Sequence, residues 1–270
     1  MIVDYHMHLI DEGAMDGRGE PVERYVEIAS QRGVDEIGFT EHVFLFRQSL
    51  PLWTLPYHLE RCRHDLDEYC DAVVEAKRQG LPVKLGLEVD FVPGRLDEVR
   101  DLLAPYPWDF LLGSVHWLDG EAVDMEPGVW AQMSVEDIWR RYFAELRRLA
   151  ESGLADVLAH PDLVKIFGRR PSHDEIQACH EAASSAIAEA GVAVEVSTAG
   201  LRKPVGELYP DADFLARCHG WGVGATLASD AHVYGDVGRD FDAGLEHLRA
   251  AGYETVTVFD GRVARQEPLG

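Results

Sequence analysis

Histidine and carboxylate residues follow several short apolar segments of this 270-residue chain. His6 and His8 come directly after the first segment, and Asp230 and His232 come after a late one. The members of each pair are two positions apart, so on an extended backbone both side chains point to the same side. Neutral imidazole and carboxylate groups bind zinc, iron or manganese, and one carboxylate can bridge two ions. The spacing therefore indicates a metal site.

Four further apolar segments end in, or contain, residues of the same types. These residues are Glu41 and His42, Glu88, His116, and His160. A single histidine after a strand is usually a surface or capping residue, but chance placement of six histidines in this way is improbable. The remaining histidines are interpreted as surface or capping residues. They are His58, His64, His173, His180, His219 and His247.

The apolar segments have the length and composition of buried parallel strands. They are Met1–Tyr5, Glu36–Phe39, Val83–Val89, Phe110–Ser114, Ala155–Ala159, Val192–Val196, Val223–Ala228 and a late segment, Thr255–Phe259. Segments with the apolar spacing or composition of helices alternate with them. These are Val22–Gln31, Leu59–Gln79, Leu96–Leu103, Val135–Glu151, Ile176–Ala190, Phe214–Cys218 and Asp242–Ala250.

The alternation of strands and helices predicts an α/β fold with a parallel sheet. About seven strand–helix units favour a barrel over an open sheet. No linker-like stretch divides the chain, so residues 1–270 are expected to form one domain. In a barrel the carboxyl ends of the strands converge on one face, where active sites are built. Residues as distant in sequence as His6 and His232 are therefore expected in one pocket.

The composition limits the classes of partner. The chain has 25 Lys and Arg residues against 48 Asp and Glu residues, a formal net charge of −23. This charge disfavours binding to nucleic acids and anionic membranes, which are held by basic surfaces. We find no secretion signal and no apolar run of about 20 residues, the length needed to span a membrane. The four cysteines show no CxxC pairing, which favours reduced thiols in a cytoplasmic protein.

The motifs resemble those of the PHP (polymerase and histidinol phosphatase) superfamily, in the same order along the chain. They are His6-x-His8, Thr40-Glu41-His42, Glu88, Ser114-Val115-His116, His160-Pro161 and Ser229-Asp230-Ala231-His232. The segments Ser197–Pro204 and Glu207–Pro210 resemble the stand-alone histidinol-phosphatase branch. This resemblance implies a distorted (β/α)7 barrel of the PHP type. It also implies two or three divalent metals and hydrolysis of L-histidinol phosphate in histidine biosynthesis.

The resemblance further implies three groups of metal ligands. They are His6, His8, Glu88 and Asp230 for the first metal, Glu88, His116 and His160 for the second, and His42 with His232 for the third. Family members often add another histidine shortly after the first motif, but this chain has none there. Asp11 and Glu12 are the alternatives for that position.

The implied mechanism is direct attack of a metal-bound hydroxide on the phosphoester. Glu41 is expected to orient a ligand or a bound water. Either Asp162 or Asp230 could protonate the leaving alkoxide, directly or through water, and the sequence does not choose between them. Two or three ions of zinc, iron or manganese fit the ligand types equally well.

Candidate phosphate-binding residues lie near the ends of the fifth and sixth strands. Arg169 and Arg202 are expected to clamp the phosphate, and Lys203 is a weaker candidate. Trp117 follows His116 and could form a wall of the pocket. Residues 44–58 contain four aromatic side chains, which indicate either a lid or ordinary loop packing.

Three other functions remain open at this point. The first is a phosphoesterase of the same family that acts on a nucleotide or another small phosphate. The second is a polymerase-associated module, which the negative charge disfavours. The third is a metal-binding protein without catalytic activity. Neither the native metal nor the oligomeric state follows from the sequence.

Overall fold

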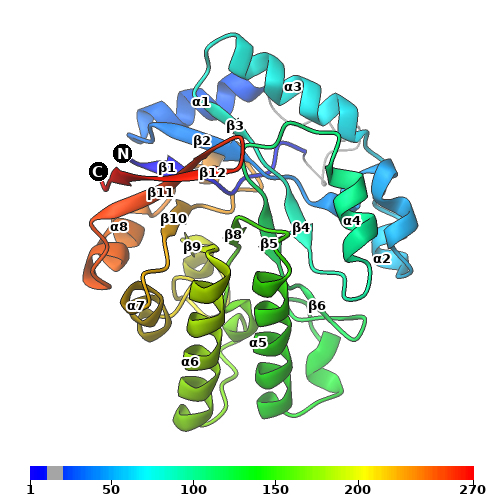
Figure 1. Ribbon diagram of the computed structural model, residues 1–270, viewed down its shortest axis with the longest axis vertical. Coiled ribbons are helices and arrows are strands. Elements are labelled where there is room, and N and C mark those ends of the chain that lie inside the picture. The colour runs from blue at the N-terminus through cyan, green and yellow to red at the C-terminus, as the bar shows by residue number, and fades with distance from the viewer. Residues whose placement is uncertain (11–20) are drawn as a thin grey trace.

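Two parallel sheets form the centre of the computed structural model, which describes residues 1–10 and 21–270 (Figure 1). The first sheet has the order β1-β2-β3, and the second has the order β10-β9-β8-β5-β4. Their strands are β1 (Val3–Asp4), β2 (Glu36–Phe39), β3 (Val83–Leu85), β4 (Glu88–Asp90), β5 (Leu112–Ser114), β8 (Val157–Leu158), β9 (Ala193–Ser197) and β10 (Ala225–Ala228). The predicted α/β fold with parallel strands is confirmed.

The two sheets are joined to each other at both ends. Met7 forms a parallel bridge with Ala231, and His42 forms one with Glu88. The Tyr5 backbone N–H also donates to the carbonyl oxygen of Leu227, at 3.1 Å. The strands therefore follow one another around a ring, which is consistent with the predicted barrel and brings the carboxyl ends of β1, β2 and β10 together.

The helices lie between the strands in sequence and cover them. They are α1 (Val22–Gln31), α2 (Pro56–Leu59), α3 (Leu66–Arg78), α4 (Leu96–Leu103), α5 (Val135–Glu151), α6 (His173–Ala190), α7 (Ala212–Gly220) and α8 (Phe241–Ala250). The predicted bounds of α1, α4 and α5 are confirmed. Ser134 caps α5 by accepting from the Asp137 N–H, as expected from their spacing. Figure 1 shows α5 and α6 side by side.

The single long helix predicted over Leu59–Gln79 is wrong. The structure has the short α2 and then α3, which begins only at Leu66. Asp65 caps α3 by accepting from the Asp67 N–H, and its carboxylate also binds Arg47 and Gln48. These contacts hold Asp65 outside the helix, so the chain turns before α3 starts.

The predicted strand Val83–Val89 is split in two, β3 and β4. Gly86 lies at the break, where a Cβ atom would come within 2.7 Å of the Thr40 side chain and 2.9 Å of the Phe110 ring. The close approach of these neighbours requires glycine. The late segment forms β11 (Thr255–Asp260), which pairs antiparallel with β12 (Val263–Pro268) outside the parallel sheets. A second hairpin joins β6 (Trp117–Leu118) and β7 (Glu121–Ala122).

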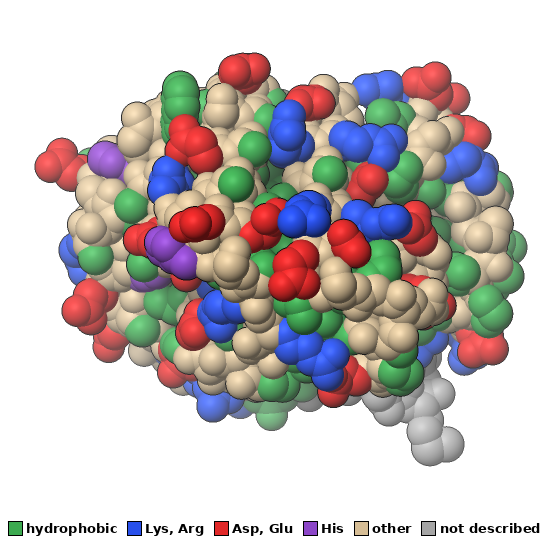
Figure 2. Space-filling view, turned by 90° about the horizontal axis from the view of Figure 1, so that it is seen from below, with side chains coloured by type: hydrophobic (Ala, Val, Ile, Leu, Met, Phe, Trp, Pro, Cys, Tyr) green, Lys and Arg blue, Asp and Glu red, His purple; other side chains and the backbone are tan. Residues whose placement is uncertain are grey.

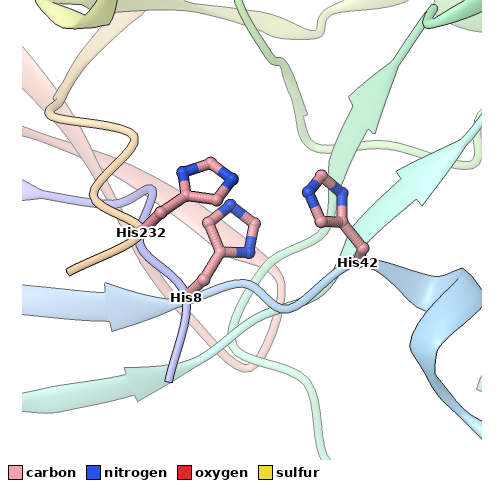
Figure 3. Close-up of side chains that lie close together, drawn as sticks. All are labelled: His8, His42 and His232. Carbon is pink, nitrogen blue, oxygen red and sulfur yellow. The ribbon is translucent and has the colours of Figure 1, made fainter. Parts of the chain in front are cut away.

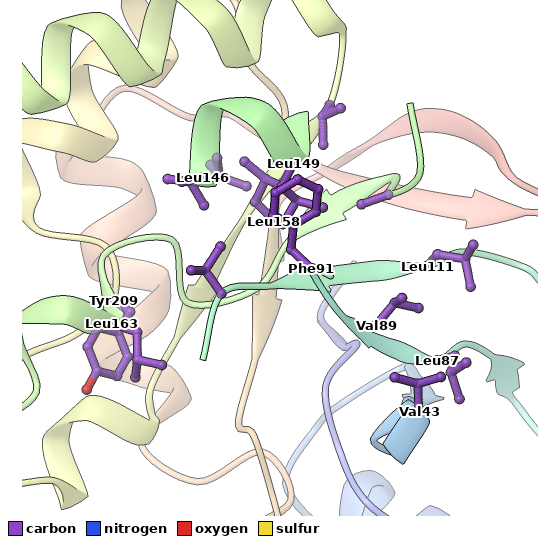
Figure 4. Close-up of a cluster of buried hydrophobic side chains, with 14 of the residues drawn as sticks. Val43, Leu87, Val89, Phe91, Leu111, Leu146, Leu149, Leu158, Leu163 and Tyr209 are labelled. Atoms are coloured by element: carbon purple, nitrogen blue, oxygen red, sulfur yellow. The ribbon is translucent and has the colours of Figure 1, made fainter. Parts of the chain in front are cut away.

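Apolar side chains from strands and helices pack into two buried clusters. The larger includes Leu146 and Leu149 of α5 together with Phe91 and Leu158, part of which is shown in Figure 4. The smaller unites residues in and beside several parallel strands with β11. Within it the Tyr5 and Phe110 rings stack with centroids 4.9 Å apart. These clusters fix the strands, and hence the positions of the residues that follow them.

Charged side chains of both signs are interspersed over the face shown in Figure 2. Ion pairs such as Arg140 with Glu175 and Arg95 with Glu98 lie on the outside of the molecule. In the described part of the chain, no helix is both long enough and apolar enough to cross a membrane.

Candidate metal centre

The histidines and carboxylates predicted from the strand ends lie together in the structure. Their ligand atoms form four overlapping groups, in each of which all atoms lie within 4.8 Å of one another. The groups are His6, His8 and Asp230; His6, Glu88 and His160; His42, Glu88 and His116; and His8, His42 and His232. We call these eight residues the metal group. They come from sequence positions 6 to 232, which the ring of strands brings to one end.

Glu88 lies at the middle of the metal group. Its Oε2 is 2.7 Å from His42 Nδ1 and 3.3 Å from His6 Nε2, while its Oε1 is 3.2 Å from His160 Nε2. A carboxylate with imidazoles on both oxygens has the geometry of a bridge between two ions. The resemblance implied a bridging role for Glu88, and that role stays a prediction.

His8 belongs to two of the four groups. Its Nε2 lies 3.5 Å from Asp230 Oδ1, and its ring is 4.4 Å from that of His42 and 4.3 Å from that of His232. Figure 3 shows these three histidines close together, each from a different strand end. The resemblance implied His42 and His232 for a third metal, with Asp11 or Glu12 as a further ligand, so His8 is an additional candidate there. Asp11 and Glu12, the other candidates, lie outside the described residues.

Several polar atoms of the metal group are buried without a hydrogen-bond partner in the described residues. They are His6 Nε2 and both ring nitrogens of His8. Buried polar atoms are normally paired, because leaving one unpaired costs about 1–3 kcal/mol. So many converging imidazole and carboxylate atoms fit divalent metal ions, which would satisfy them together. The residues present therefore suit the metals that the motifs imply.

Three buried carboxylates hold parts of the metal group in place. Two of them, Glu195 and Asp90, were not predicted as site residues from the sequence. Glu195 Oε2 lies 2.8 Å from His6 Nδ1, and Asp90 Oδ1 lies 2.7 Å from His116 Nδ1. Each carboxylate holds the far nitrogen of a ring and leaves Nε2 for a metal. Glu41, the third, accepts from the backbone N–H groups of Leu9 and Ile10 and therefore fixes the turn after His8. This supports the orienting role expected for Glu41.

Two residues of the metal group also have an unusual backbone conformation. His160 and Asp230 have φ angles of 26° and 51°, in the left-handed region that residues other than glycine rarely adopt. Asp4 accepts from the N–H and hydroxyl of Ser229 and from the N–H of Gly238, which holds the chain on both sides of Asp230. Such strain persists only where surrounding contacts impose it, and it is common at functional sites.

The charges within the metal group shift its pKa values strongly. Burial raises the pKa of Glu88, but the nearby imidazoles, His42 foremost, hold it well below its usual range. Burial lowers the pKa of His8, but Asp230 and Glu41 raise it to about 9. Burial lowers that of His116 as well, whereas Asp90 and Glu88 raise it to about 10. In the metal-free chain Glu88 is therefore ionised and these two imidazoles carry protons.

Metal loading is expected to strengthen steeply with pH. His8 and His116 must lose their protons to bind a metal, and with pKa values of about 9 and about 10 they hold them at neutral pH. The apparent zinc affinity should then rise about tenfold per pH unit for each proton displaced, up to about pH 9. Competition titrations with a chromogenic chelator between pH 6 and 9 would measure it. An affinity independent of pH, after correction for the chelator, would contradict this expectation.

Comparison with known proteins places the chain in a family. The PHP domain model matches residues 4–199, which include most of the metal group. The chain belongs to the PHP domain family. The resemblance inferred from the motifs is thus confirmed over more than half of the sequence.

The similarity of this PHP protein to known relatives covers almost its whole length. It is 35% identical to a probable histidinol-phosphatase of Deinococcus radiodurans, over 95% of this chain and 96% of that one. It is 26% identical to the histidinol-phosphatase of Bacillus subtilis, over 85% and 94%. Its structure matches that of histidinol phosphate phosphatase from Lactococcus lactis, with a TM-score of 0.78 and 21% identity over 98% of both chains. That protein was crystallised with zinc, L-histidinol and phosphate.

The candidate phosphate clamps occupy different surroundings in this PHP protein. Arg202 donates to the carbonyl oxygen of Ser229 at 2.6 Å and is largely buried beside the chain that carries Asp230. Arg169 pairs with Glu126 at 2.5 Å and lies over the Trp130 ring. Arg202 therefore contacts the residue before Asp230 and also lies 3.8 Å from Asp236 and 3.6 Å from Asp240, whereas Arg169 is paired with Glu126.

The other candidate substrate residues also differ in position. Asp162 is fully buried, and its Oδ2 accepts from Lys165 Nζ at 2.8 Å and from the Asp211 N–H at 2.7 Å. Among the described residues its Oδ1 has no hydrogen-bond partner, so these contacts hold one oxygen of Asp162 and leave the other free. Lys203 is exposed. Trp117 packs beside the Tyr57 ring, with centroids 5.1 Å apart.

Two histidines interpreted from the sequence as surface or capping residues are instead buried. His58 and His180 are only 2% and 1% exposed. His180 stacks on Phe214 with centroids 4.7 Å apart, as an ordinary core ring does. Phe44, in the segment considered as a lid, is buried and stacks on His42 at 4.7 Å. This side chain therefore packs against the metal group as a fixed wall.

Replacing Glu195 is expected to weaken metal binding without unfolding the protein. Glu195→Gln keeps the size of the side chain but removes the charge that orients His6, and its amide can no longer accept from Nδ1 with the same strength. Zinc affinity should fall about 10- to 100-fold, the usual cost of losing such an orienting carboxylate. Metal titration with a competing chelator would measure it. The exposed Glu151→Gln is the matched control, and equal affinities for the two variants would count against a positioning role.

Proposed function

We propose that this chain hydrolyses a small phosphomonoester, with L-histidinol phosphate as its substrate, in histidine biosynthesis. The observation that carries the proposal is the metal group itself, eight histidine and carboxylate residues with several unpaired buried ligand atoms. The choice of substrate is supported by the 35% identity to a probable histidinol-phosphatase over 95% of the chain.

The metals supply the central chemistry when bound, because divalent ions lower the pKa of a coordinated water and bind phosphate oxygens. Glu88 and Asp230 provide the negative charge that holds these ions among the histidines. Glu195 and Asp90 keep the rings of His6 and His116 in the tautomer that offers Nε2. We propose zinc as the native metal, since the similar Lactococcus protein binds it.

The remaining chain residues act on the phosphate and the leaving group in this proposal. Arg202 lies beside the chain that bears Asp230 and is placed to add a guanidinium to the phosphate site. Asp162 is a positioning residue, because Lys165 and the Asp211 N–H already occupy its Oδ2. Of the two candidate proton donors, Asp230 is the one that belongs to the metal group. The excess of carboxylates around the site suits a leaving group that carries an amine.

A cytoplasmic location is part of the proposal. All four cysteines are free thiols in the structure, and reduced thiols are usual in that compartment.

Phosphate release from a panel of substrates tests the function. The zinc-loaded protein should hydrolyse L-histidinol phosphate with a kcat/KM at least about 100-fold above that for p-nitrophenyl phosphate and nucleoside monophosphates. Such a ratio requires contacts to the leaving group, since the metals act on every phosphomonoester alike. Similar rates across the panel would instead support a general phosphoesterase of the same family.

A further inference from the structure

A cavity lies beside the metal group, between α2, the end of β4, the β6–β7 hairpin and α5. Its volume is about 390 Å³, which is within the range of small-molecule sites. The lining residues that matter here are Trp53, His58, Asp90, Phe91, Trp117 and Leu118. Four of these are apolar or aromatic, and two are polar and buried. A mainly apolar wall with a few polar groups is the usual composition of a ligand site.

The cavity is separate from the place where phosphate would bind. None of the eight residues of the metal group is among its lining residues, within the described part of the chain. Asp90 connects the two regions, because it lines the cavity and its Oδ1 lies 2.7 Å from His116 Nδ1. A molecule in the cavity would therefore contact the residue that orients a metal ligand.

Both polar lining residues keep buried atoms without a partner. Among the described residues, no group hydrogen-bonds either ring nitrogen of His58 or the Oδ2 atom of Asp90. The His58 ring stacks on Trp53 with centroids 4.4 Å apart, and Trp117 meets it edge-on at 4.7 Å. A neutral imidazole and a free carboxylate oxygen can both accept a hydrogen bond. The cavity therefore has unused acceptors next to aromatic faces.

The charges around the cavity favour a cation. Three lining residues are acidic and two are basic, and the basic ones are already paired. Arg141 pairs with Asp119, and Arg148 pairs with Glu145 at 2.8 Å. Asp90 is thus the one lining carboxylate, as far as the structure describes them, without a lysine or arginine partner. His116 holds Asp90 Oδ1, so an ammonium group would bind the free Oδ2, and tryptophan faces also attract cations.

We infer that this cavity binds a small aromatic amine, and that its occupancy is coupled to the metals. The ammonium donates to Asp90, and the ring lies against Trp53, Phe91 and Trp117. Because the ammonium and His116 share the Asp90 carboxylate, the ammonium weakens the hydrogen bond between Asp90 and the His116 ring. The amine and the metal bound at His116 therefore lower each other's affinity by the same factor. This site is independent of the identity of the phosphoester.

Calorimetry with 2-phenylethylamine tests the site directly, with 2-phenylethanol as the neutral molecule of the same shape. The zinc-loaded protein should bind one amine, at least about tenfold more tightly than the alcohol. Saturating inorganic phosphate should leave this binding in place, since phosphate occupies the metals. Displacement of the amine by phosphate, equal binding of amine and alcohol, or no saturable binding would overturn the inference.

A pair of variants locates the binding. Ala144 is exposed on α5 and lines the cavity, so Ala144→Trp should fill it and abolish amine binding. Arg147 is exposed on the same helix outside the lining, so Arg147→Trp should bind the amine as the parent does. Both variants should keep the zinc content and phosphate affinity of the parent, which also shows that they fold. Amine binding retained in Ala144→Trp would place it elsewhere and refute the assignment.

Zinc titration in the presence of the amine tests the coupling. Saturating 2-phenylethylamine should weaken zinc binding about three- to tenfold in the parent, and have no effect in Ala144→Trp. By reciprocity, the amine should bind the zinc-free protein more tightly by the same factor. An unchanged zinc affinity in the parent would refute the coupling. Neither readout uses phosphatase activity, so failure of the proposed function would be seen separately in the substrate panel.

Discussion

Glu88→Gln is expected to remove both metal binding and phosphatase activity. Glu88 has imidazoles on both carboxylate oxygens, and no other carboxylate belongs to two of the four ligand groups. An amide has one acceptor in place of two and no charge, so it cannot bridge two ions. Loss of the metals costs several kcal/mol in the transition state, which is a fall of about a thousandfold or more in kcat/KM. Metal analysis and phosphate release would measure both effects.

A thermal readout distinguishes lost metal binding from a damaged fold. Zinc should raise the Tm of the parent, because a ligand that binds only the folded state stabilises it. Glu88→Gln should fold, but zinc should leave its Tm unchanged. The exposed Glu254→Gln is the matched control and should behave as the parent does. Full activity of Glu88→Gln without bound metal would refute the metal-dependent mechanism.

The ligands of the metal group could be predicted because their signal is local in sequence. His6 and His8, like Asp230 and His232, follow apolar strands at a spacing of two, which fixes both the place and the direction of the side chains. A parallel fold then brings the strand ends together, whatever the details of the helices between them. For this reason the structure brings these residues together even though the long helix expected after residue 59 was wrong.

The residues that support the ligands could not be predicted in the same way. Glu195 lies inside β9, within an apolar run, and its role comes from contacts to His6 and to the His160 N–H on other strands. Asp90 was visible beside Glu88, but its bond to His116 depends on the pairing of β4 with β5. His58 is on a short helix whose burial comes from the aromatic residues around it. Such contacts between distant segments leave no periodic signal in the sequence.

The negative charge of the chain has a consequence for substrate binding. The net charge of −23 repels phosphate, and the cations closest to the candidate site already have partners. Arg202 donates to backbone carbonyls and lies 3.6 Å from Asp240, while Arg169 pairs with Glu126. The metals must therefore supply most of the attraction for phosphate as well as the chemistry.

Removal of the metals should accordingly abolish phosphate binding. We expect the affinity for inorganic phosphate, measured by calorimetry, to fall at least about 100-fold after treatment with a chelator and dialysis. Zinc added back should restore it, which would exclude damage to the protein. Arg202→Ala in the zinc-loaded protein should lower the phosphate affinity less, by about 10-fold. One guanidinium adds to the positive charge of the ions but does not replace it. If the stripped protein kept its phosphate affinity, arginines and backbone N–H groups would hold the substrate, and the metals would serve the reaction alone.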